Sequence, residues 1–420
     1  MSRPTGWNCL INRFEVKIIK NITYRSTLTA CFIGYVIQAI VNNFVPMLFL
    51  RFQAEFGIPL AQITWLITIN FAVQLTVDAV APAFVDKIGY RVSMQLAHIL
   101  SASGFLLMTI LPDKLPSPFA GLVICIALYA VGGGLLEVLV SPIVEACPTD
   151  NKETAMSLLH SFYCWGQAAT VLLSTVFFAI AGIEHWRILA ALWSIVPMLN
   201  FILFLKVPIA ALSETRGQES GFAELIKTPQ FLFFCLMMLC AGACELTVSQ
   251  WASAFAESGL QISKSAGDLI GTMGFALCMG SARALFSKFG EKIPLQKVML
   301  ASSVLCVGSY LLIGLTKAPA AGLIGCMLCG FSVGIFWPGT FSLSAAGLRN
   351  GGTLMFALLA LAGDLGCCAG PTIAGKASAL LGSDLHRGIL CGIMFPCIML
   401  CCVLLMNKEY RKGEVRKGSK

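Results

Sequence analysis

Apolar stretches long enough to cross a lipid bilayer constrain this chain more than any other feature. A helix of about 20 apolar residues spans the hydrocarbon core of a bilayer, and only helices and closed barrels satisfy their backbone groups there. Charged residues make up 12% of the 420 residues, hydrophobic residues make up 57%, and the mean hydropathy is +0.82. We therefore predict an all-α polytopic membrane protein. Its twelve transmembrane helices are expected at residues 26–50, 62–85, 92–111, 118–142, 154–181, 187–206, 229–255, 266–287, 295–315, 319–346, 353–381 and 387–406.

The longest polar gap between these segments divides the predicted helices into two sets of six. It runs from Pro208 to Pro229 and carries charges, Gly and Ser. The expected organisation is a basic N-terminal segment, a six-helix bundle, a linker, a second six-helix bundle and a basic tail. Their predicted boundaries are 1–25, 26–206, 207–228, 229–406 and 407–420.

The positions of Lys and Arg predict the orientation in the membrane. With the N-terminus inside, 22 of the 29 Lys and Arg residues fall in the segments on the inner side. Cytoplasmic loops carry such an excess, so we expect both termini in the cytoplasm and a bacterial-type inner-membrane location. The net charge of +8 then reflects topology and lipid contact, with no nucleic-acid partner expected, and a monomer suffices for this architecture.

Motifs for enzymatic chemistry do not appear in the sequence. It lacks the H-E-x-x-H, G-x-S-x-G and Walker A patterns, and "VGGGLL" follows no soluble strand. Most of the 18 cysteines lie in apolar runs and form no paired C-x-x-C motif, so we expect no metal site and no cofactor. The protein is predicted not to be an enzyme, and any transport must be driven by a gradient.

Four acidic residues fall inside the apolar segments. Such groups are costly in a membrane and are functional candidates, although each could also brace neighbouring helices. Glu137, at the middle of its segment, is interpreted as a proton site or substrate ligand, with Glu245 and Asp364 as further proton-coupling candidates. Asp78 lies eight residues before Asp86, near the same helix face, and is assigned a structural or gating role.

Aromatic and amide side chains within the segments suit a neutral, hydroxyl-bearing substrate. Aromatic faces provide stacking surfaces, and amides provide both donors and acceptors. A histidine there is also compatible with proton relay, and one of the tryptophans could instead belong to the interfacial belt. The predicted substrate-binding residues are Gln38, Asn42, Asn43, Glu137, His160, Trp165, Gln167, Gln250, Trp251 and Trp337.

The loop motif "VDKIGYR" after the second segment resembles the signature G-x-x-x-D-R/K-x-G-R-R of the major facilitator superfamily. Pro82 and Tyr90 depart from that signature, and "GSARALFSKFGEK" from Gly280 is a looser second copy. The resemblance implies a charge latch that opens and closes as the two halves rock. The gating residues that it implies are Asp86, Lys87, Gly89, Arg91 and Arg283, in addition to Asp78.

Within that superfamily the chain resembles the fucose–galactose–glucose permeases, a family typified by L-fucose:proton symport. "NNFVPMLFLRFQ" from Asn42 is similar to the first-helix motif of that family, and "GGGLLEVLVSP" from Gly132 to its fourth-helix motif. The resemblance places Glu137 on a carboxylate that the family uses for proton coupling and sugar binding. Pro46 stands where the family has a second acidic residue, so another carboxylate must replace it or Glu137 must act alone.

The sequence therefore leads to a first hypothesis of proton-coupled uptake of a neutral sugar or similar small polar metabolite. Sodium stays open as the coupling ion. The alternative is proton-antiport efflux of an amphipathic compound, which the 28 Phe and 16 Met would suit. A membrane sensor or scaffold is disfavoured because no sizeable soluble domain is expected.

Overall fold

The computed structural model describes residues 23–148, 152–210, 222–289, 293–348 and 352–418, and every regular element within them is helical. The predicted terminal segments 1–25 and 407–420 lie largely outside the described residues or side chains. The first half of the chain forms α2 (Tyr24–Asn43), η1 (Val45–Leu48), α3 (Phe49–Phe56), α4 (Leu60–Ile88), α5 (Tyr90–Met108), α6 (Leu111–Lys114), α7 (Pro118–Ala146), α8 (Lys152–Ala181), η2 (Ile183–His185) and α9 (Trp186–Lys206).

The second half continues the same all-helical pattern. Its elements are α10 (Phe222–Leu225), α11 (Pro229–Ala254), the π-helical η3 (Phe255–Gly259), α12 (Lys264–Ala266), the π-helical η4 (Gly267–Met273), α13 (Gly274–Phe289), α14 (Leu295–Leu315), α15 (Pro319–Val333), α16 (Phe336–Gly347), α17 (Gly352–Leu380), α18 (Leu385–Cys391) and α19 (Met394–Gly418).

The twelve-helix prediction is confirmed. Eleven helical segments among the described residues are long and apolar enough to cross a membrane. The twelfth is α5, which buries the polar residues Ser93, His98 and Ser101 against its neighbours. Three predicted helices are each broken into two pieces, at η1, after Val333 and after Cys391. A proline lies within η1 (Pro46), and one lies five residues after each of the other two breaks (Pro338 and Pro396). Proline supplies no backbone N–H to a helix.

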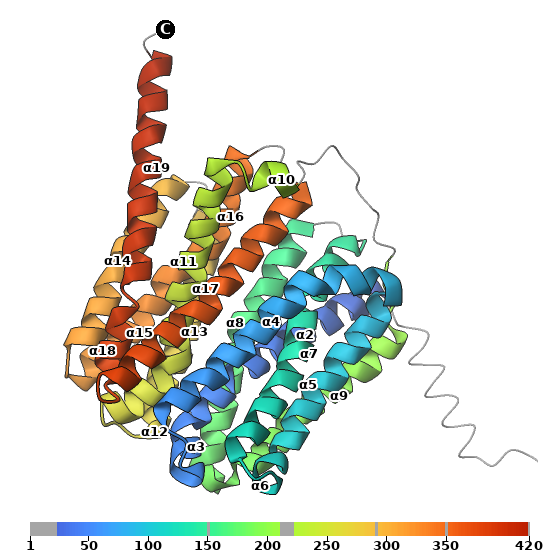
Figure 1. Ribbon diagram of the computed structural model, residues 1–420. Helices are drawn as coiled ribbons and strands as arrows, with labels where there is room; N and C mark the ends of the chain where they lie inside the picture. Colours follow the sequence, from blue (N-terminus) through green and yellow to red (C-terminus); the bar gives the residue numbers. More distant parts are fainter. Residues whose placement is uncertain (1–22, 149–151, 211–221, 290–292, 349–351, 419–420) are drawn as a thin grey trace, which may run out of the picture.

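The helices of each half pack mainly on one another. In the first half α7 packs on α2, α4 and α5, and in the second half α11 packs on α17, α15 and α19. The halves meet where α4 packs on α17, α8 on η4 and α13, and η1 on α11. Figure 1 shows α10, α16 and the C-terminus at one end of the protein, which we call the linker end. The opposite end, which we call the α12 end, contains α3, α6, α12 and α18.

Glycine allows α11 and α17 to approach most closely. A Cβ atom added to Gly366 would overlap the carbonyl oxygen of Leu239 in α11, and one added to Gly370 would lie 2.6 Å from the carbonyl oxygen of Ala243. On the other helix, a Cβ on Gly242 would overlap the carbonyl oxygen of Gly363. Small residues permit such close backbone contact between membrane helices.

Polar contacts join the two halves on the α12 side of the bundle centre. The hydroxyl groups of Thr68 in α4 and Thr372 in α17 lie 2.7 Å apart. The Lys376 ammonium lies 4.6 Å from the centre of the Trp65 ring. Since α4 begins and α17 ends at the α12 end, these contacts close that end of the interface.

Cross-linking this contact should stop transport in a reversible way. We expect Thr68→Cys/Thr372→Cys to form a disulfide under oxidation, because the two native hydroxyls already touch. The bond would hold the α12 end shut, and reductant should restore transport. A protease site inserted in the linker makes the cross-link visible, since the halves then stay joined on a gel only when oxidised. Either single variant is the control, and full transport by the oxidised double variant would contradict the expectation.

Candidate functional site

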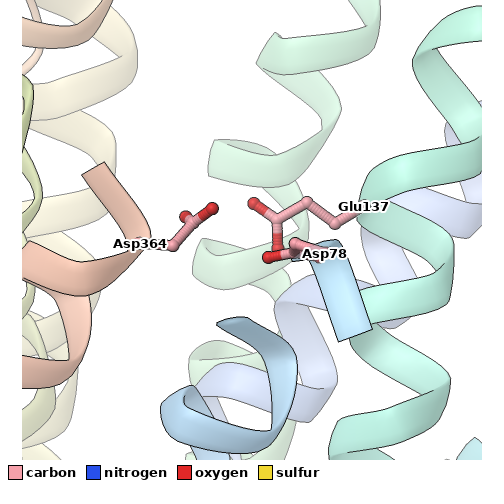
Figure 2. A group of neighbouring side chains, drawn as sticks. All are labelled: Asp78, Glu137 and Asp364. Carbon is pink, nitrogen blue, oxygen red and sulfur yellow. The ribbon is translucent and has the colours of Figure 1, made fainter. Parts of the chain in front are cut away.

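Three carboxylates from three helices meet between the two halves. Asp78 of α4 and Glu137 of α7 belong to the first half, and Asp364 of α17 belongs to the second. One oxygen from each lies within 4.8 Å of the others, and Figure 2 shows the side chains of α4 and α7 facing that of α17. No amide, hydroxyl or basic group among the described residues donates a hydrogen bond to either oxygen of Asp78.

This triad (Asp78, Glu137 and Asp364) cannot hold three negative charges without a cost. Two unit charges about 5 Å apart repel by about 3 kcal/mol at an effective dielectric constant of about 20. A proton shared between two carboxylates removes that repulsion, and so does a cation that contacts all three oxygens. The geometry therefore suits reversible uptake of a small positive charge at the boundary between the halves.

Three consecutive glycines position Glu137 by letting α7 touch three helices in one turn. A Cβ atom on Gly132 would overlap Ser101 of α5, and one on Gly133 would lie 2.6 Å from Oε1 of Gln38 in α2. One on Gly134 would lie 3.1 Å from Cα of Gln74 in α4. The close approach of α2 and α4 brings their amides beside the carboxylate one turn further along α7.

A chain of amides runs from Glu137 across α2 and α4. Gln38 donates hydrogen bonds of 2.8 Å to Oε2 of Glu137 and to Oε1 of Gln74. Gln74 donates to Oδ1 of Asn42 at 2.9 Å, and Asn70 donates to the same oxygen at 3.2 Å. Gln74 and Asn70 were missed in the sequence analysis, although Asn70, Gln74 and Asp78 recur every four residues and so share one helix face.

Pro46, which replaces an acidic residue of the resembled family, creates a contact between the halves. In an unbroken helix the N–H of residue 46 would bind the carbonyl oxygen of Asn42, but proline has no N–H. Gln250 of α11 instead donates to that oxygen at 2.9 Å. Asn42, Pro46, Asn70 and Gln250 line a small cavity next to this bond.

Glu245 and Arg283 form a second charged cluster, also at the boundary. The guanidinium of Arg283 in α13 lies 3.8 Å from Oε2 of Glu245 in α11. It also donates to the carbonyl oxygen of Gly334 and to Sγ of Cys164 in α8, each at 3.2 Å. Pro338 leaves the Gly334 carbonyl without its helical partner, as Pro46 does for Asn42. Arg283, predicted to gate, thus lies beside Glu245, predicted to couple protons.

The three candidates on α8 point in different directions. Gln167 is buried and donates to the hydroxyl of Ser249 in α11 at 2.9 Å. The ring of His160 lies 5.4 Å from that of Tyr35. Trp165 is 52% exposed and lies on the outer, lipid-facing stripe of α8 with Leu158 and Leu172, so the structure does not bring it together with the other candidates.

The remaining predicted binding residues divide between packing and the neighbourhood of the triad. Trp251 is fully buried and donates to the carbonyl oxygen of Pro371, which makes it a core residue in this conformation rather than one of an interfacial belt. Asn43 donates to the carbonyl oxygen of Ala39 in its own helix. The ring of Trp337 covers Gly363, directly before Asp364, so it lies next to the triad.

The loop motif between α4 and α5 contributes a helix cap rather than a contact across the boundary. Arg91 donates 2.7 Å bonds to the carbonyl oxygens of Phe204 and Val207 at the end of α9, where a cation also complements the helix dipole. Gly89 has φ of +84° and joins α4 to α5, and Lys87 is exposed. The side chain of Asp86 lies outside the described part of the chain. The gating role of this motif stays a prediction.

Sequence comparison places this architecture in a known class of transporters. The profile of the Major Facilitator Superfamily matches residues 29–371, which is most of the chain, so the protein belongs to that superfamily. No curated protein matches the sequence.

Solved structures of transporters share the fold at low sequence identity. A bacterial homologue of the human lysosomal transporter Spinster, in an inward-facing and unoccupied conformation, is 15% identical over 92% of this chain and 97% of its own, with a TM-score of 0.74. A D-xylose–proton symporter is 14% identical over 91% and 95%, with a TM-score of 0.73. The Escherichia coli fucose:proton symporter is 15% identical over 90% and 98%, with a TM-score of 0.60. At these identities the likeness concerns the fold alone.

Proposed function

We propose that this protein takes up a neutral sugar or similar small polar metabolite together with protons, by alternating access. The observation that carries the proposal is the triad, because its three carboxylates are divided between the two halves. A positive charge bound there acts on the relative position of the halves and not only on one helix. The D-xylose and fucose symporters of the same fold support this choice over efflux.

In this mechanism, protonation of the triad controls the approach of α17 to α4 and α7. When the carboxylates are ionised, repulsion of about 3 kcal/mol per pair opposes closure at this level. A bound proton removes that repulsion and favours the state in which the halves meet around the substrate. Proton and substrate then favour the same state, so each raises the affinity for the other by the same factor.

The amide chain is the proposed site for substrate hydroxyl groups in the first half. Gln38, Asn42, Gln74 and Asn70 lie between Glu137 and the small cavity. Oδ1 of Asn70 is buried and accepts no hydrogen bond from any residue that the structure describes, so it is available to a hydroxyl donor. Because Gln38 binds Glu137 directly, substrate bound to the amides is linked to the proton site.

With both termini in the cytoplasm, as the Lys and Arg distribution predicts, the closed α12 end faces outside. We propose a bacterial-type inner-membrane location and a functional monomer, since one chain contains both halves of the site. In the uptake direction, the triad is loaded outside, and it releases its proton to the cytoplasm.

Proton movement that depends on substrate tests the proposal. Neutral sugars and polyols are added singly to lightly buffered, de-energised cells or proteoliposomes that contain the protein. Alkalinisation outside in response to one group of compounds is expected, and cells without the protein are the control. Accumulation of a compound only in the presence of sodium, with no pH change, would overturn proton coupling. Inward proton movement that occurs only while amphipathic compounds are extruded would overturn uptake.

A further inference from the structure

The Glu245–Arg283 pair is buried, yet its two charges do not form a hydrogen bond. Glu245 is 6% exposed, and its Oε2 atom accepts no hydrogen bond within the described chain. Nη2 of Arg283 lies 3.8 Å from that atom, whereas charge-assisted N–H···O bonds are about 2.7–2.9 Å long. A buried carboxylate oxygen without a partner is costly, so an unmatched pair of this kind requires an explanation.

Arg283 is held away from Glu245 by its other contacts. Its Nε donates to the Gly334 carbonyl and its Nη1 to Sγ of Cys164, both at 3.2 Å. Its Nη2 lies 3.8 Å from Sδ of Met279. Sulfur is a weak acceptor, and a guanidinium has five N–H donors in a fixed plane. The cation thus retains unused donor capacity directly beside the unused oxygen of Glu245.

The unpaired oxygen of Glu245 and the unused N–H groups of Arg283 together match the hydrogen-bonding capacity of one hydroxyl group. A hydroxyl oxygen about 2.8 Å from both atoms would accept from Nη2 and donate to Oε2. The pair is neutral overall, and the nearby triad adds only acidic groups, so an anionic ligand is disfavoured. The cluster also faces the first half, because Cys164 lies on α8 and the neighbouring Tyr163 accepts from Asn42 of the amide chain at 3.4 Å.

We infer that Glu245 and Arg283 form a second-half subsite that binds one hydroxyl group of the substrate. The inference rests on the proposed function, since it gives the neutral hydroxylated substrate a contact in α11 and α13 in addition to the amides of α2 and α4. It changes the roles of both residues from those predicted from the sequence. Glu245 becomes a substrate ligand rather than a proton carrier, and Arg283 a specificity residue rather than a gate.

Equilibrium binding of deoxy sugars tests the inference without requiring proton coupling. Calorimetry on the purified full-length protein compares the best-bound neutral sugar with each of its monodeoxy analogues. A hydrogen bond to charged groups corresponds to about 10- to 150-fold in affinity, so one analogue should bind more weakly by such a factor. For each analogue we define the deoxy ratio as its Kd divided by the Kd of the parent sugar. In Glu245→Gln/Arg283→Gln the one raised deoxy ratio should fall towards unity. The deoxy ratios for the other positions should stay as in the unmodified protein.

A milder variant and a matched control complete the experiment. Glu245→Gln alone keeps the shape of the side chain and should reduce the same ratio in part, which covers failure of the double variant to fold. Asp268→Asn removes another buried carboxylate, which lies 3.1 Å from the Lys264 ammonium and outside the proposed subsite, and should change no ratio.

Three outcomes would overturn the subsite. The first is that the deoxy ratios are unchanged in both Glu245 variants. The second is that the protein prefers a carboxylate-bearing sugar and that this preference depends on Arg283. The third is that no neutral hydroxylated compound binds. Substrate-dependent proton movement together with unchanged ratios would leave the proposed function intact and reject the subsite alone. Binding with the expected ratios but without proton movement would reject proton coupling and retain the subsite.

Discussion

Glu137→Gln is expected to abolish accumulation of substrate while leaving exchange of substrate across the membrane. Each coupled proton gains about 2.3 kcal/mol from a potential of 100 mV, which corresponds to about 50-fold accumulation. The variant should equilibrate its substrate at a ratio near one. The amide can still accept the 2.8 Å bond from Gln38, so binding and counterflow should survive. Uptake of radiolabelled substrate into energised vesicles, with counterflow on the same preparation, measures both properties.

The triad makes a further distinction within this experiment. Asp364→Asn should also reduce accumulation, because it removes the one carboxylate that the second half of the protein contributes to the triad. Glu184→Gln alters an exposed glutamate at the α12 end and serves as the control. Concentrative uptake by Glu137→Gln at the level of the unmodified protein would reject Glu137 as part of the coupling site.

Gly366→Leu should have the largest effect on stability. An added Cβ overlaps the carbonyl oxygen of Leu239 and lies 2.9 Å from the backbone nitrogen of Ala243. Backbone cannot rotate aside as a side chain can, so α11 and α17 must separate. Overpacking of this kind commonly costs about 1–3 kcal/mol and sometimes more, and we expect a cost at or above the upper end. The measurement is thermal unfolding in detergent, followed with a thiol-reactive dye because most of the cysteines described are buried.

The matched control for this substitution is Gly308→Leu in α14. Gly308 is exposed, and no atom of the described residues outside its own stretch of helix lies within 4 Å of the position of its added Cβ, so the unfolding temperature should change little. Gly366→Ala should lie between the two, since it adds one carbon to the same close contact. Equal unfolding temperatures for the two leucine variants would show that α11 and α17 are not held at the distance described.

The helices could be predicted because the bilayer sets their length and apolar character. The predicted 295–315 segment coincides with α14, and most other boundaries differ by a few residues. The broken helices were not predicted, although Pro46 and Pro338 lie within them. A proline in a membrane helix can be accommodated when another group binds the freed carbonyl, and those groups, Gln250 and Arg283, are more than 50 residues away in sequence.

The candidate site was predictable in its chemistry and less so in its geometry. Glu137 and Asp364 were recognised as acidic groups in lipid, but the role assigned to Asp78 rested on its spacing from Asp86 and not on its neighbours in the fold. Trp165 illustrates a second limit. In a membrane protein both the lipid face and the core are apolar, so the pattern of a helix does not reveal which side of α8 is exposed.

The bond from Gln250 to the Asn42 carbonyl has an unusual genetic consequence. Its acceptor is a main-chain atom, so no substitution of the Asn42 side chain removes it directly. Position 46 controls it instead, because any residue other than proline supplies an N–H that competes for the same oxygen. An evolving lineage can therefore loosen this connection between the halves by changing the single codon for residue 46, without altering either side chain that the bond joins.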